Sequence, residues 1–185
     1  MAEIKGTVLI DSIRAIKARG GEAEFQKIVA KLSPETKPIF EGRISQSSWY
    51  PLDAFAEFLE VDIRETAAGV REVLITRAER VIEAQLQGIY RVFIKYGSPM
   101  FVIKRIAAVH ATYYQGIEIQ PQKHDANEAV IRYIGLRKRH EIMGYGIIGF
   151  FRKALEISGA KNVAVKFTEP ISDEKPYAEL TITWE

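Results

Sequence analysis

The sequence predicts an α+β protein in which several N-terminal helices pack against a small antiparallel sheet. Over most of the first 115 residues, apolar side chains recur every three or four positions, which is typical of amphipathic helices. After Gly116 they alternate with polar ones, and a helical period over residues 141–158 interrupts this alternation once. The order is therefore helices followed by β-β-α-β-β. It lacks the repeated βα units of a parallel sheet.

The helical part contains five predicted helices, separated by glycine, proline and serine. They are expected over residues 8–19, 21–32, 51–60, 65–96 and 99–115. The pair Gly20-Gly21 ends the first helix, and Ser47-Ser48 offers an N-cap before Trp49-Tyr50-Pro51 at the start of the third. Ser98 caps the fifth helix and Pro99 opens it.

In the second half, strands are predicted over residues 117–120, 128–134, 162–167 and 177–184, and the last two form a hairpin. The helix between the strand pairs contains Gly144, Gly146 and Gly149, which match the G-x-G-x-x-G pattern of dinucleotide sites. That site requires a buried strand running into the first glycine, whereas a basic run precedes it here. The glycines are better explained by close approach of this helix to a neighbouring backbone or to a ligand.

Composition excludes several classes of function. The length of 185 residues fits a single domain over residues 1–185, and the net charge of +2 is too small to indicate nucleic-acid binding. The absence of cysteine excludes disulfides, thiolate metal sites and a cysteine nucleophile. No signal peptide or membrane-spanning stretch is present, so we expect a cytoplasmic protein. No catalytic motif occurs either, and we expect no enzyme activity.

Among the three histidines, His110 differs from His124 and His140 in its surroundings. It shares a helical face with apolar residues and with Tyr113 and Tyr114, whereas the other two lie in polar or basic segments and are expected at the surface. A histidine in this position is either an interior residue hydrogen-bonded to a tyrosine or carbonyl, or a ligand in a pocket. The sequence leaves both alternatives open.

The order of elements, and the segment Tyr133-Ile-Gly-Leu-Arg137 before the glycine-rich helix, resemble the H-NOX superfamily, which includes four-vinyl-reductase domains and Golgi transport tethers. The N-terminal half, with KGTVLIDSIRAI and SSWYPLDAFAEFLE, is more similar to an uncharacterised paralogous family of myxobacteria. H-NOX proteins hold haem through a histidine and grip its propionates with a Y-x-S-x-R motif. Tyr133 and Arg137 match that motif, Gly135 replaces its serine, and His110 lies nearer to Tyr133 than in the family.

The resemblance implies a non-enzymatic sensory or regulatory domain that binds a small, largely apolar or anionic ligand in an internal pocket. Its expected contacts are His110, Tyr113, Tyr114, Tyr133 and Arg137. Trp49, Tyr50, Tyr90 and Phe93 are further candidates for the pocket lining. The main expectation is that the domain binds no cofactor. The alternatives are a ligandless module that forms a homodimer or docks on a signalling partner through residues 142–151 and the last strand, and a haem gas sensor that uses His110.

Overall fold

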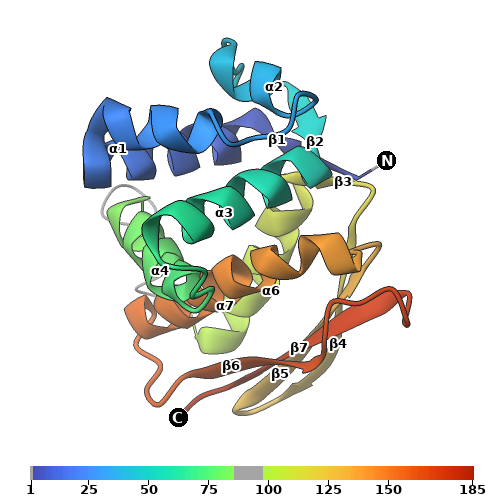
Figure 1. The fold of residues 1–185 in the computed structure, drawn as a ribbon. Helices are drawn as coiled ribbons and strands as arrows, with labels where there is room; N and C mark the ends of the chain where they lie inside the picture. The colour runs from blue at the N-terminus through green and yellow to red at the C-terminus, as the bar shows by residue number, and fades with distance from the viewer. Residues whose placement is uncertain (1, 86–97) are drawn as a thin grey trace.

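The computed structural model describes residues 2–85 and 98–185 (Figure 1). Its helices are α1 (Gly6–Val29), α2 (Lys37–Glu41), α3 (Leu52–Thr66), α4 (Val73–Gln85), α6 (Pro99–Ala111), the 3-10 turn η1 (Lys138–His140) and α7 (Glu141–Ile157). Its strands are β1 (Glu3–Lys5), β2 (Trp49–Pro51), β3 (Tyr114–Gln115), β4 (Glu118–Asp125), β5 (Glu128–Ile134), β6 (Ala164–Glu169) and β7 (Tyr177–Thr183).

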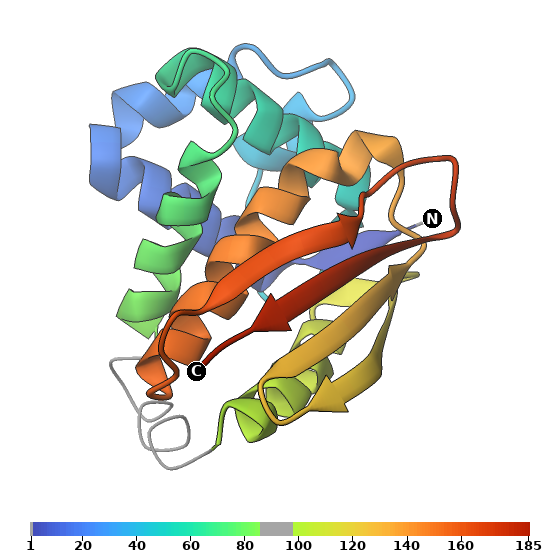
Figure 2. The same ribbon diagram turned by 90° about the horizontal axis from the view of Figure 1, so that it is seen from below.

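The main sheet has four antiparallel strands in the order β4-β5-β7-β6. Alternate residues of the two central strands are buried against the helical layer, and they are Ala129, Ile131, Tyr133, Ala178, Leu180 and Ile182. In Figure 2 the orange-red edge strand β6 crosses in front of the orange helix α7. The predicted α+β class and the β-β-α-β-β order are thereby confirmed.

A second sheet, which the sequence did not predict, joins three distant segments in the order β2-β1-β3. Ile4 lies between Tyr50 on one side and Tyr114 on the other, and it is fully buried. The prediction that Trp49 to Pro51 belong to the start of a helix is wrong, because these residues pair with β1 and α3 begins at Leu52.

Of two predicted helix boundaries, one agrees with the structure and the other does not. The break at Gly20-Gly21 is confirmed, since Gly21 has a φ of 75° and kinks α1. The single helix predicted over residues 65–96 is wrong at its start. α3 continues to Thr66, Ala68 and Gly69 then adopt φ values of 49° and 81°, and α4 begins at Val73. The remainder of that prediction, residues 86–96, lies outside the described residues.

The glycine-rich helix α7 packs closely on α4 at one of its three glycines. A Cβ atom at Gly149 would lie 2.2 Å from the carbonyl oxygen of Ile75, whereas one at Gly146 would meet nothing within 4 Å. Close approach to a backbone is therefore confirmed for Gly149. Within residues 142–151, the predicted contact surface, Ile142 and Phe151 are fully buried in the core and cannot contribute to it, whereas Tyr145 and Ile148 are half-buried. That surface stays a prediction.

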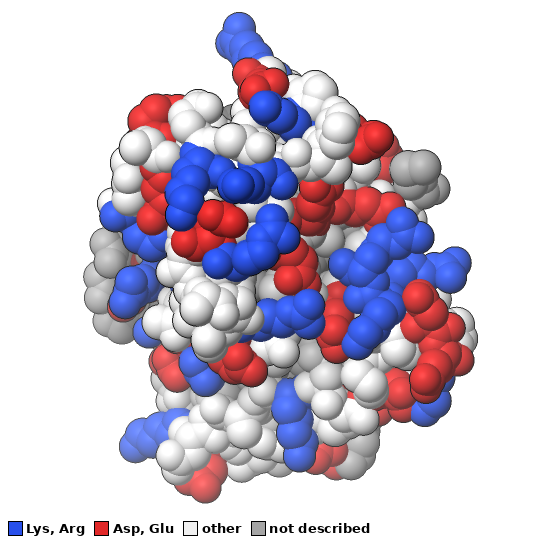
Figure 3. Space-filling model, viewed as in Figure 1, with Lys and Arg blue, Asp and Glu red and all other residues white. Residues whose placement is uncertain are grey.

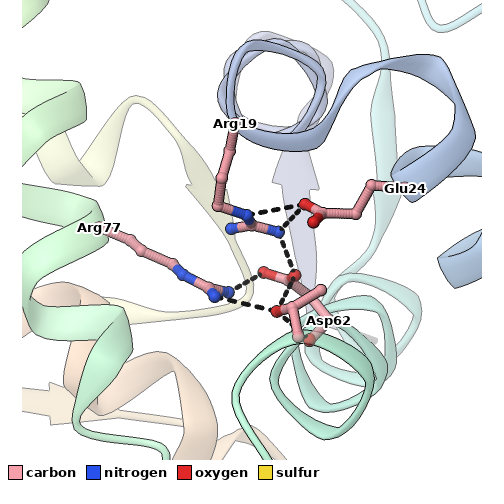
Figure 4. A network of polar contacts seen from close by, with 5 residues as sticks. Arg19, Glu24, Asp62 and Arg77 are labelled. Carbon is pink, nitrogen blue, oxygen red and sulfur yellow. Dashed lines mark hydrogen bonds and ion pairs between the residues drawn. The ribbon is translucent and has the colours of Figure 1, made fainter.

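A buried carboxylate ties the N-terminal helices together (Figure 4). Asp62 on α3 is 2% exposed, and its two oxygens accept hydrogen bonds of 2.7 Å from Arg19 of α1 and from Arg77 of α4. Glu24 also pairs with Arg19, and Thr66 accepts a hydrogen bond from Arg77. Because Arg19 and Arg77 come from α1 and α4, the Asp62 carboxylate joins these two helices to α3 and fixes the relative positions of all three.

Ion pairs also join the helical layer to the start of α7. Arg71 contacts Glu60 of α3 at 2.7 Å and Glu141 of α7 at 3.1 Å, and Arg139 contacts Asp53 of α3 at 2.7 Å. Figure 3 shows basic side chains beside acidic ones across the visible face. Exposed pairs of this kind contribute little each, so they help to orient α3 and α7 more than they stabilise the fold.

Candidate ligand site around His110

The candidate site forms where the end of α6 meets β5 and α7. The side chain of Ser98 accepts a hydrogen bond from the backbone N–H of Phe101, and Pro99 occupies the first turn, so the predicted N-cap is confirmed. This start places His110 in the last turn of α6. The inward face of β5 carries Tyr133 to the same place, and His110 Nδ1 lies 3.1 Å from the Tyr133 hydroxyl oxygen.

Aromatic rings surround His110. Its ring centroid lies 4.5 Å from that of Phe150 and 5.4 Å from that of Phe151, both on α7. The ring of Tyr114, on β3, lies edge-on to the imidazole, with 6.0 Å between the two ring centroids. His110 is 6% exposed and Tyr133 is 1% exposed, so their hydrogen bond lies in a largely apolar environment.

This burial keeps the polar groups of the site neutral. Desolvation lowers the pKa of His110 from 6.5 to about 4 and raises the pKa of Tyr114 to about 12. It also raises the pKa of Tyr133 well above its usual value. A neutral imidazole has one donor and one acceptor nitrogen. If Nδ1–H donates to Tyr133, the second nitrogen, Nε2, is left with a lone pair that can bind a ligand.

The structure brings together three of the five predicted site residues, His110, Tyr114 and Tyr133. Tyr113 is half-buried, and its carbonyl accepts a hydrogen bond from the backbone N–H of Lys5. Arg137 is exposed, and no described contact joins its guanidinium group to His110 or Tyr133.

The further candidates for the pocket lining do not join this cluster in the described residues. Trp49 and Tyr50 belong to β2, where the Tyr50 hydroxyl accepts a hydrogen bond from the backbone N–H of Ser45. Tyr90 and Phe93 lie outside the described residues.

Phe150 and Phe151 were not predicted as neighbours of His110, although both belong to the predicted apolar helix. The prediction that His140 lies at the surface is wrong, because its side chain is 2% exposed. Its Nε2 lies 2.7 Å from an Asp53 carboxylate oxygen, and its Nδ1 accepts a hydrogen bond from the backbone N–H of Arg137. Both ring nitrogens are thus occupied, and His140 holds η1 against the start of α3.

Residues 2–85 and 98–185 contain no cluster of three or more His, Cys, Asp or Glu side chains that could hold a metal ion. None of the helices in these two ranges is long and apolar enough to cross a membrane.

The chain matches no protein-family model and no curated protein sequence. Its fold is similar to solved H-NOX structures. An Fe(II) unliganded mutant from K. algicida has a TM-score of 0.73 and 14% identity, with 98% of this chain and 97% of that chain covered. A mutant from T. tengcongensis has a TM-score of 0.71 and 12% identity, with 98% of each chain covered.

The S. oneidensis protein in its Fe(II)NO state gives a TM-score of 0.71 and 13% identity, with 98% of this chain and 99% of that chain covered. The narrower likeness to a myxobacterial family stays a prediction. The chain has an H-NOX-like fold.

Proposed function

We propose that residues 1–185 form one non-enzymatic, cytoplasmic regulatory domain that senses a small, largely apolar ligand beside His110. The observation that carries this proposal is the His110–Tyr133 hydrogen bond of 3.1 Å inside a cluster of aromatic rings. Ligand pockets typically combine such an apolar lining with a few convergent polar groups. The H-NOX-like fold supports the same class of function, because the solved neighbours are described with Fe(II) and NO.

The chemistry of the pair favours a neutral ligand with one hydrogen-bonding group. Both side chains are uncharged near neutral pH, since burial lowers the pKa of His110 to about 4 and raises that of Tyr133. A charged group brought into this cluster would lose its hydration without gaining an opposite charge. His110 Nε2 would contact the polar atom of the ligand, and the rings of Phe150 and Tyr114 would contact its apolar part.

The residues present fit only half of a haem site. A neutral His110 with Nδ1 bonded to Tyr133 has the arrangement of an iron-binding imidazole. The propionate side does not fit, because the Tyr133 hydroxyl is already bonded to His110 and Arg137 is exposed and apart from the cluster. We therefore assign an organic ligand without a cofactor, and we derive no step through haem.

The proposal is tested by mass spectrometry of the undenatured protein and by an absorption spectrum after expression with a haem precursor. We expect a colourless protein with a stoichiometric added mass that His110→Leu loses. Tyr145→Phe is the matched control. Tyr145 is also on α7, but its ring is not one of those that contact His110. A Soret band that disappears in His110→Leu would instead identify a haem sensor. Bare polypeptide mass without colour would contradict the proposal.

A second candidate function, a ligandless interaction module, is favoured by one observation. Phe150 lies so close to His110, at 4.5 Å between ring centroids, that the rings themselves occupy space beside the imidazole. In that case the aromatic cluster is a packed core, and the protein works through its surface as a homodimer or on a signalling partner. Light scattering over a range of concentrations measures the homodimer directly.

A further inference from the structure

A groove separate from the His110 site lies between α7 and the edge strand β6. Its volume is about 220 Å³, and its apolar lining consists of Gly144, Tyr145, Ile148, Phe167, Pro170 and Ile171. Apolar cavities of about 150 Å³ admit benzene, whereas pockets for drug-sized ligands start at about 300 Å³. The groove therefore has room for one large apolar side chain. It lacks the volume of a typical cofactor site.

The strand beside the groove has an open edge. In the described residues β6 pairs with β7 alone, so its other side presents backbone N–H and C=O groups without a strand partner. Figure 2 shows β6 at the margin of the sheet alongside α7. An open strand edge next to a side-chain pocket is the arrangement by which proteins bind extended peptides as an added strand.

Two features of β6 restrict what can pair with it. The register shift between Phe167 and Glu169 ends the regular strand, so only Ala164 to Phe167 offer an even ladder. Lys166 is exposed in the middle of that stretch. A central lysine and a bulge both discourage indiscriminate pairing with long strands. Lys166 and the bulge therefore restrict the edge of β6 to pairing with a short extended segment.

The chemistry of that segment follows from the pleat. A residue directly opposite Lys166 lies on the same face as the lysine, and the adjacent residue points to the α7 side with Phe167. Lys166 has no ion pair within the described residues, whereas Glu141, the other charged residue of the groove, is paired with Arg71 and Lys138. A negative charge opposite Lys166 would therefore find an unpaired cation. An apolar neighbour would fill the groove.

We propose that the edge of β6 and this groove bind an extended peptide of a partner protein, in which an acidic residue is followed or preceded by a large apolar one. The peptide would add a fifth strand to the sheet beyond β6. This surface does not include His110, so the inference goes beyond the proposed function and does not depend on it.

The test uses two fluorescent hexapeptides with blocked ends, Ser-Thr-Glu-Phe-Thr-Ser and its charge-reversed counterpart Ser-Thr-Lys-Phe-Thr-Ser. We expect wild-type protein to bind the acidic peptide more tightly and Lys166→Glu to reverse the preference. Each affinity should change by about threefold to tenfold, because one attractive cross-strand pair is exchanged for one repulsive pair. Lys161→Glu is the matched control, since Lys161 is exposed, precedes β6 and carries the same charge change. It should change either affinity less than twofold.

A second variant tests the groove. Ile148→Trp fills it from α7 and should abolish binding of both peptides while the circular dichroism spectrum stays that of the folded protein. The proposal is overturned if neither peptide binds the wild-type protein at 1 mM, or if Lys166→Glu and Lys161→Glu act alike. It is also overturned if the free protein dimerises and Lys166→Glu makes it monomeric, because a second copy of the chain would then occupy the edge.

Discussion

Two glycines of the same helix should respond in opposite directions to replacement by alanine. In α7, a Cβ at Gly149 would lie 2.2 Å from the Ile75 carbonyl oxygen and 3.0 Å from the Ile75 carbonyl carbon. A Cβ at Gly146 would meet nothing within 4 Å. Both replacements improve helix propensity by about 1 kcal/mol. Only Gly149→Ala also forces α7 and α4 apart.

The magnitude follows from that contact. A carbon and a carbonyl oxygen normally approach to no less than 3.0 Å, so the two helix backbones must separate by most of an ångström, and no flexible side chain can yield instead. Overpacking of this kind costs about 3 kcal/mol. After the propensity gain, Gly149→Ala should lower the free energy of unfolding by about 2 kcal/mol. Gly146→Ala should raise it by about 1 kcal/mol.

Urea denaturation followed by circular dichroism measures both changes. For a chain of this size, the predicted gap of about 3 kcal/mol corresponds to about 6–12 °C in Tm. Equal stabilities of the two variants would refute the reasoning, since helix propensity would then account for both. Gly149→Ala should also weaken ligand binding at the His110 site, because Phe150 and Phe151 follow directly and contact His110.

Three further perturbations address the buried polar groups. Asp62→Asn should lower the free energy of unfolding by about 3 kcal/mol in urea titrations, because two arginines lose their carboxylate, whereas Glu41→Gln, which removes the exposed ion pair with Lys37, should cost below about 0.5 kcal/mol. Burial lowers the pKa of His110 from 6.5 to about 4, so the unfolded chain binds more protons between these values. Stability should therefore fall from pH 7 to pH 4.5 by about 2 kcal/mol more in the wild type than in His110→Gln. Tyr133→Phe should cost about 1–2 kcal/mol by leaving Nδ1 of His110 without its partner, and Tyr145→Phe, on a half-buried ring, should change thermal stability by less than half as much.

Periodicity predicted the large elements of this fold because their burial patterns are regular. The alternation of Ala129, Ile131 and Tyr133 along one strand is the pattern that a half-buried sheet imposes, and the structure buries those side chains. The small sheet escaped because its strands have only two or three residues. Such short strands are defined by partners far away in the sequence and show no period of their own.

The residues of the candidate site could likewise be predicted only where the local sequence pattern reflects their surroundings. Its position on an apolar helical face distinguished His110 from the other two histidines, and the structure supplies its tyrosine partner from β5. Local charge was misleading at His140, which follows three basic residues yet is buried. The cause lies 87 positions away in Asp53, whose carboxylate accepts its hydrogen bond, and no local pattern reports that distance. Similarly, Ala68 and Gly69 end α3 although the apolar period continues through them.

The small sheet has a consequence for how the chain is assembled during synthesis. β1 precedes every other described element in the chain, yet it is the central strand of its sheet. One edge can pair once Pro51 has been made, but the other waits for Tyr114 and Gln115. α1 follows β1 directly, so the strand that leads into this helix has only one of its two partners until β3 has been made. β1 is therefore completed by a segment that is synthesised much later, and a nascent chain stalled before Tyr114 carries an open strand edge along β1.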